Sequence, residues 1–139
     1  GIFLCTAGVM SVKLCIVAIS LITHHLHASE IDCNGDCDCS QSPDGETCTL
    51  NCIGTDVCKD SALTCGANNP CIVNCNGISS CGGNSKIFGA SATHLVVNCE
   101  GTDACKGNTI VNCASHSCSI ACGSSTSCDG TNINVGDTK

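Results

Sequence analysis

The stretch VNCEGTDACKGNTIVNC at residues 97–113 decides the fold, because it carries the tripeptide VNC at both ends. VNC occurs once more at 73–75, and LNC stands at 50–52. Around these tripeptides, equivalent cysteines recur in steps of 23, 24 and 23 residues: Cys52, Cys75, Cys99 and Cys122. A fixed period of this length is typical of an architecture in which each repeat stacks on its neighbours.

Three full repeats can be read in succession: CIGTDVCKDSALTCGANNPCIVN (52–74), CNGISSCGGNSKIFGASATHLVVN (75–98) and CEGTDACKGNTIVNCASHSCSIA (99–121). A partial repeat follows from Cys122, and a compressed one precedes them from Cys33. Apolar and polar residues alternate within each repeat, as they do in a β-strand, and Gly-, Ser- and Asn-rich corners separate the strands. We therefore predict an all-β chain that forms a parallel β-helix of four to five rungs, each of 23–24 residues with two or three short strands.

The repeat assigns a direction to each side chain of the predicted strands. One inward row contains Leu50, Val73, Val97 and Ile120, with the repeated cysteines two residues further on, and a second contains Leu63, Ile87, Val111 and Ile133. The asparagine between each aliphatic residue and its cysteine then points outward. Stacking predicts an outward ladder of Asn51, Asn74 and Asn98, and a partial second ladder of Asn112 with Asn134.

The N-terminal residues predict export from the cell. An apolar run, LCIVAISLIT (14–23), follows Lys13, and small residues precede a cleavage point after Ala28, as in a secretory signal. Residues 1–28 are therefore read as a signal peptide, with Met10, the single methionine, as a candidate initiator. The alternative is an uncleaved membrane anchor formed by residues 2–23.

The predicted domain organisation has two further parts. Residues 29–51 form a capping, compressed rung, and residues 52–139 form the remaining rungs. The last residues, NINVGDTK, contain no evident cap, so the sequence leaves two interpretations open. Either the chain is a piece of a longer solenoid or it assembles end to end through its exposed strand edges.

Secretion determines how the 18 cysteines are interpreted, because an even, dense set in an oxidising compartment indicates disulfides. Cys5 and Cys15 fall in the leader, which leaves sixteen. The rung of 75–98 has Gly89 and Leu95 where its neighbours have cysteines, and joint loss indicates that these two cysteines bond each other within a rung. Extending this rule pairs all sixteen: Cys33 with Cys37, Cys39 with Cys48, Cys52 with Cys58, Cys65 with Cys71, Cys75 with Cys81, Cys99 with Cys105, Cys113 with Cys118, and Cys122 with Cys128.

A metal-cluster protein of the metallothionein kind is the alternative use of these cysteines, suggested by CDC at 37–39. The regular aliphatic rows argue against it, because a metal cluster needs no apolar core. Five acids at 32–46 suggest either a calcium site or an acidic end cap, and the cap is favoured because their spacing fits no calcium-binding loop: Asp32, Asp36, Asp38, Asp44 and Glu46. No cofactor is expected.

Two features of the sequence resemble those of a known group of proteins. They are corners of the form C-x-G-x-x-x-C, as in CNGISSC and CEGTDAC, and strands that end in an aliphatic residue, Asn and Cys. The group consists of the short, Cys-rich, right-handed parallel β-helix repeat proteins of the secreted, uncharacterised kind found in protist genomes. The resemblance covers residues 33–135, and CGSSTSC and CNGDC depart from the corner pattern. It implies an architecture, and its larger relatives such as pectate lyases imply a carbohydrate-active alternative, but neither specifies a site.

The charged residues do not suggest an enzyme. Asp56 and Asp103 occupy equivalent corners two rungs apart, about 10 Å by rung spacing, which is long even for the carboxylate pair of an inverting glycosidase. We expect them to be solvated and paired locally with Lys59 and Lys106, and we predict no catalytic residues. The net charge of −7, with no Trp and no Tyr, argues against nucleic-acid binding.

The sequence therefore predicts a secreted, non-catalytic repeat protein with a structural, adhesive or surface-interaction role. Its partners are unknown, with self-association and an extracellular glycan as the two candidates, and contact with a membrane is expected only for an uncleaved anchor. A carbohydrate-binding or polysaccharide-active protein is the first alternative and an ice-binding protein the second. The outward rows argue against ice binding because they are irregular: Thr49, Ile72, Val96 and Ser119, then Thr64, Phe88, Asn112 and Asn134.

Overall fold

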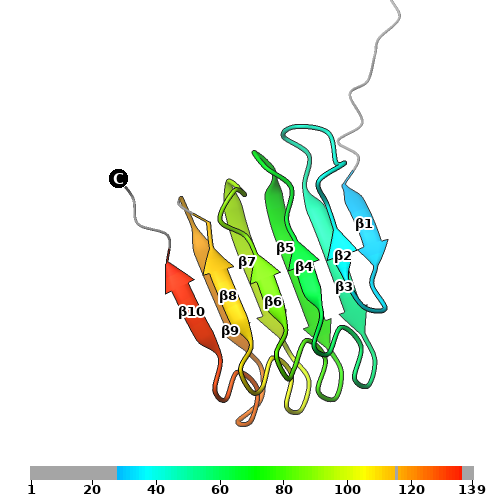
Figure 1. Ribbon diagram of the computed structural model, residues 1–139, viewed down its shortest axis with the longest axis vertical. Helices are drawn as coiled ribbons and strands as arrows, with labels where there is room; N and C mark the ends of the chain where they lie inside the picture. The colour runs from blue at the N-terminus through cyan, green and yellow to red at the C-terminus, as the bar shows by residue number, and fades with distance from the viewer. Residues whose placement is uncertain (1–27, 115, 136–139) are drawn as a thin grey trace, which may run out of the picture.

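The computed structural model describes residues 28–114 and 116–135, and it contains two parallel five-stranded sheets. The first sheet consists of β1 (Ser29–Asp32), β3 (Cys48–Ile53), β5 (Pro70–Asn76), β7 (His94–Cys99) and β9 (Cys118–Cys122). The second consists of β2 (Cys37–Asp38), β4 (Ala62–Thr64), β6 (Lys86–Phe88), β8 (Ile110–Cys113) and β10 (Asn132–Val135). The chain alternates between the sheets, so each rung gives one strand to each, and the predicted parallel β-helix is confirmed (Figure 1).

The register follows the sequence repeat residue by residue. Leu50 lies opposite Val73, Val73 opposite Val97, and Val97 opposite Ile120. The second sheet aligns Leu63 with Ile87, Ile87 with Val111, and Val111 with Ile133. The outward rows align as well, so the column Thr49, Ile72, Val96 and Ser119 is as irregular as the sequence indicates.

The core is the narrow space between the two sheets. Seven aliphatic side chains in it are fully buried, and cysteines fill most of the remaining volume: Leu50, Leu63, Val73, Ile87, Leu95, Val97 and Val111. Each sheet contributes one row of aliphatic residues, and Leu95 lies beside the row of the first sheet, opposite Cys71. The buried core of the described residues contains no aromatic side chain.

The last rung differs from the prediction. Ile133 and Cys122 were expected to point into the core, but Ile133 is 53% exposed, Cys122 is also exposed, and Ile120 is only half-buried. All three keep their register with the rung before. They are exposed because the described part of the chain places no rung over them.

The first rung begins earlier than its cysteines indicate. β1 precedes Cys33 and aligns Ile31 with Leu50, so the inward row has one more member than predicted. Residues 1–27 lie outside the described residues, and with them the predicted signal peptide or anchor apart from Ala28. Within the described residues, no helix has the length and apolarity needed to cross a membrane.

Candidate functional site

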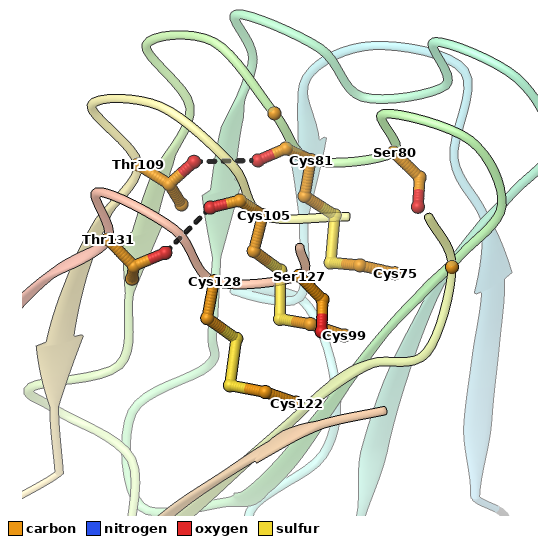
Figure 2. The surroundings of a disulfide bond; sticks show 12 residues. Cys75, Ser80, Cys81, Cys99, Cys105, Thr109, Cys122, Ser127, Cys128 and Thr131 are labelled. Carbon is orange, nitrogen blue, oxygen red and sulfur yellow. Dashed lines mark hydrogen bonds between the residues drawn. A yellow bond between two sulfur atoms is a disulfide. The ribbon is translucent and has the colours of Figure 1, made fainter. Parts of the chain in front are cut away.

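The described residues form eight disulfides, and each joins two cysteines of the same rung. Their partners are those that the repeat predicts: Cys33–Cys37, Cys39–Cys48, Cys52–Cys58, Cys65–Cys71, Cys75–Cys81, Cys99–Cys105, Cys113–Cys118 and Cys122–Cys128. Five of them close the corner that leads from the first sheet to the second, and Figure 2 shows three of these stacked along the helix. So many bridges are typical of a protein that folds in an oxidising compartment.

The rung without a second bridge has a side chain in its place. Leu95 aligns with Cys71 of the rung before and is fully buried. A Cβ on Gly89 would collide with the Leu95 side chain, so the glycine makes room for the leucine. The pair Gly89 and Leu95 therefore fills the volume that a disulfide fills in the adjacent rungs.

The bridged corners have an unusual backbone. Cys58, Cys81, Cys105 and Cys128 all lie in the left-handed region, with φ of 56°, 50°, 55° and 61°. For a residue with a Cβ this conformation costs on the order of 1–2 kcal/mol. The corner therefore needs contacts that hold it, and the disulfide at each of these residues is one of them.

A row of hydroxyl groups supplies a second contact at these cysteines. Thr109 Oγ1 donates a hydrogen bond to the carbonyl oxygen of Cys81 at 2.9 Å, and Thr131 Oγ1 donates to Cys105 at 2.6 Å (Figure 2). Ser85 Oγ makes the same contact with the carbonyl of Cys58 at 2.8 Å. Each hydroxyl reaches one rung back, so the row joins successive rungs at the corner.

Replacing Thr109 with valine tests this contact. Thr109 is fully buried, and Thr109→Val keeps its shape while leaving the carbonyl of Cys81 without its donor. We expect a loss of about 1–3 kcal/mol in the free energy of unfolding, measured by urea denaturation. Thr109→Ser retains the hydroxyl and serves as the control, and equal stability of Thr109→Val and the native protein would contradict the assignment.

The predicted asparagine ladders are hydrogen-bonded from rung to rung. Asn74 donates its amide to Asn51 and Asn98 donates to Asn74, both at 2.9 Å. Asn134 donates to Asn112 at 3.2 Å on the second sheet. These amides bind one another along the helix axis, so the ladders join the rungs together.

A third ladder was not predicted. Asp60 Oδ1 accepts hydrogen bonds from the backbone nitrogen and the side-chain amide of Asn84, at 2.8 and 3.1 Å. Asn108 then donates to Asn84 at 3.3 Å. The signal was present in the repeat, since Asn84 and Asn108 each follow a corner glycine, but the irregular corner length conceals the alignment with Asp60.

The corner acids form local ion pairs, as expected. Lys59 Nζ lies 3.2 Å from Asp56 Oδ1, and Lys106 Nζ lies 3.0 Å from Asp103 Oδ1. The hydrogen bond from Lys106, followed by one from Thr126, holds the pKa of Asp103 below its ordinary value of 3.8. The Lys59–Asp56 pair is exposed and contributes little to stability, and the Lys106–Asp103 pair is partly buried.

Removal of the Lys106 charge gives a testable pKa change. In Lys106→Met we expect the pKa of Asp103 to rise towards 3.8, because the largest cause of its lowering is gone. A lowered carboxyl pKa stabilises the fold above the unfolded-state value, and this contribution is lost as the pH falls through the folded-state value. Carboxyl NMR titration measures the shift; Lys86→Met is the control, and an unmoved Asp103 would argue against the pairing.

The first-rung acids do not form one site. Asp36 accepts a hydrogen bond from the backbone nitrogen of Ala62 at 2.7 Å, and Asp38 accepts two from Ser40 at 2.7 and 3.0 Å. The Asp38 carboxylate therefore fixes local backbone, and the Asp36 carboxylate binds the backbone of the next rung. Across residues 28–114 and 116–135, the groups of three ligand atoms that converge within 4.8 Å contain only cysteines.

A buried amide that the sequence did not reveal organises the turn insertion of the first rung. Asn69 is 1% exposed; its Oδ1 accepts a hydrogen bond from Gly45 N at 2.6 Å, and its Nδ2 donates to Ser42 O at 3.2 Å. The insertion SPDG (42–45) is thus fixed to the second rung. No repeat signal marks Asn69, because no other rung has an insertion to hold.

A shallow groove of about 310 Å³ lies on the outer face of the second sheet. It follows the column of Thr64, Phe88, Asn112 and Asn134 across four rungs, and the remaining lining residues come from the adjoining corners and the strand end: Cys65, Ala90, Ser91, Cys113 and Val135. Phe88 is 40% exposed there. The groove thus combines one aromatic ring with amides and hydroxyls and contains no charged side chain.

Comparisons with known proteins do not supply a family. No protein-family model matches the chain, and neither a curated protein nor a solved structure matches it. A functional conclusion for this chain therefore depends on the geometry of its own side chains.

Proposed function

We propose that the protein is an extracellular, non-catalytic structural module that presents a rigid surface to other molecules. The observation that carries this proposal is the stapling of every described rung by at least one disulfide. Such a chain holds its outward columns in fixed positions without a large core. This property suits a spacer or contact surface outside the cell, where disulfides persist.

The exposed apolar residues support a surface-interaction role. Ile53 and Ile78 are 62% and 55% exposed, and both lie at the bridged corner in adjacent rungs. Scattered exposed apolar residues are ordinary, but two on one rigid edge can act together. They are the first positions to change in an adhesion assay.

Expression through an oxidising secretory route tests the proposal. We expect the protein in the medium, without free thiols, and as a protease-resistant rod. Beads coated with it should adhere to extracellular matrix, and the double change Ile53→Ser with Ile78→Ser should weaken adhesion, whereas the control Lys59→Ser should not. Retention inside the cell as a reduced protein would contradict an extracellular role.

Binding of a neutral glycan is a second candidate, and the groove at Phe88 favours it. Sites for small ligands combine apolar surface with a few polar groups that fix orientation, and this groove has both. Its lack of charge selects a neutral ligand over an acidic one. Because it extends across several rungs, it suits an extended chain.

A glycan array with two variants tests this candidate. We expect Phe88→Ala to weaken binding about tenfold, since Phe88 is the one aromatic side chain among the described residues that line the groove. Lys86→Ala is the matched control, because Lys86 is exposed on the same strand but does not line the groove. Equal binding by the two variants, or none by the native protein, would remove the glycan candidate.

A further inference from the structure

Sulfur atoms of neighbouring rungs converge at two points of the bridged corner. The Sγ atoms of Cys75, Cys99 and Cys105 lie within 4.8 Å of one another, and all three side chains are fully buried. The Sγ atoms of Cys33, Cys52 and Cys58 form a second group of the same kind. In each group two sulfurs belong to one disulfide and the third to the disulfide of the preceding rung. Figure 2 shows Cys75, Cys99 and Cys105 of the first group.

The convergence follows from the stacking of rungs. Equivalent positions of parallel strands lie about 4.8 Å apart, so the bridges that close successive corners stack. In two of the four adjacent pairs of described corner bridges, the stacking brings three sulfurs within 4.8 Å. In the oxidised protein these contacts are only packing between disulfides. In a reduced protein the same positions would bring together thiols from residues that are far apart in sequence.

We propose that each group becomes a thiolate site for a thiophilic divalent cation, Zn²⁺ or Cd²⁺, when its two disulfides are reduced. A tetrahedral zinc site has Zn–S distances of about 2.3 Å, so its sulfurs are about 3.8 Å apart. The third sulfur of each group already lies within 4.8 Å of the two bonded sulfurs, and these two move apart when their disulfide is reduced, so small shifts of the three sulfurs reach that geometry. The released partners complete a four-sulfur set, Cys81 in the first site and Cys37 in the second.

The chemistry of each site is a reduction followed by metal binding. Two phosphine molecules each give two electrons and are oxidised to phosphine oxides, and two water molecules supply the oxide oxygens and the four protons, so the two S–S bonds break and four thiols form. One divalent cation then binds four thiolates and releases the four protons to solvent. Metal sites and disulfides use the same cysteines, so they cannot exist at the same time. The metal sites belong to the reduced chain and are separate from the proposed extracellular function.

Titration of the reduced protein with Cd²⁺ tests the proposal. The chain is reduced with a phosphine, which does not compete for the metal, and Cd²⁺ is added in the presence of a moderate chelator. We expect the first two equivalents to produce the ultraviolet thiolate-to-cadmium charge-transfer band together with the circular dichroism of the β-helix. Metal uptake without recovery of the sheet signal would overturn the proposal, because it indicates binding by an unfolded chain.

Two double variants locate the sites. Cys75→Ser with Cys81→Ser should reduce the strong stoichiometry from two Cd²⁺ to one, and Cys33→Ser with Cys37→Ser should do the same at the end of the helix if the first variant does not fold. The matched control is Cys65→Gly with Cys71→Leu, which removes a disulfide outside both groups and introduces the residues of the next rung. An equal loss of Cd²⁺ in control and test variants would rule out the two sites.

Discussion

Reduction of the protein in a metal-free buffer abolishes the parallel sheet signal at 25 °C. We expect this because each short-loop bridge contributes roughly 2 kcal/mol by restricting the unfolded chain, so eight bridges contribute about 16 kcal/mol. A domain of this size is stable by only about 5–15 kcal/mol in total. The measurement is far-ultraviolet circular dichroism before and after treatment with a phosphine and a chelator.

A variant that lacks a single disulfide provides the comparison for the fully reduced protein. Cys65→Gly with Cys71→Leu removes one disulfide, and the adjacent rung shows that Gly89 and Leu95 fill the same volume. We expect this variant to fold when oxidised, with a loss of about 2 kcal/mol. If the fully reduced native chain kept its sheet signal, the backbone and side-chain ladders alone would be sufficient for the fold, and the disulfides would have a minor role.

The period of the repeat was enough to predict the register and the cysteine partners. In a solenoid, residues that are equivalent in the repeat are also neighbours in space, so one alignment predicts Asn51 beside Asn74 and Leu63 beside Ile87. The absence of both cysteines from one rung then favours disulfides within a rung over disulfides between rungs. In this fold, the position of a residue in the repeat therefore predicts which residue it contacts in the next rung.

The contacts that sequence reasoning missed all lie where the repeat is irregular. Thr131 is three residues after Cys128 and Thr109 is four after Cys105, yet both hydroxyls bond the cysteine carbonyl of the preceding rung. Asn69 holds an insertion that only one rung contains. Such contacts depend on the path of the corner backbone, which the spacing of cysteines does not specify.

The largest effect of a single substitution is expected at the stacked corner glycines. Gly77 has φ of 152°, and a Cβ there would collide with the backbone of Gly54 in the preceding rung. A Cβ on Gly101 would collide in the same way with the backbone of Gly77. The obstacle in each case is main chain, so a change of side-chain rotamer cannot relieve it.

Gly77→Ala is therefore expected to destabilise the protein by about 3 kcal/mol or more, since two rungs must separate and a left-handed conformation must accept a side chain. Gly35→Ala is the matched control: Gly35 has φ of 138°, but a Cβ there meets nothing within 4 Å. The loss of stability in Gly35→Ala measures the cost of the backbone conformation alone, on the order of 1–3 kcal/mol. Urea denaturation of both variants gives the difference, which is the contribution of close stacking between rungs. Equal losses of stability in the two variants would mean that the close approach of Gly77 to Gly54 adds no cost when a side chain is introduced. The stacked corner glycines would then not determine the spacing of the rungs.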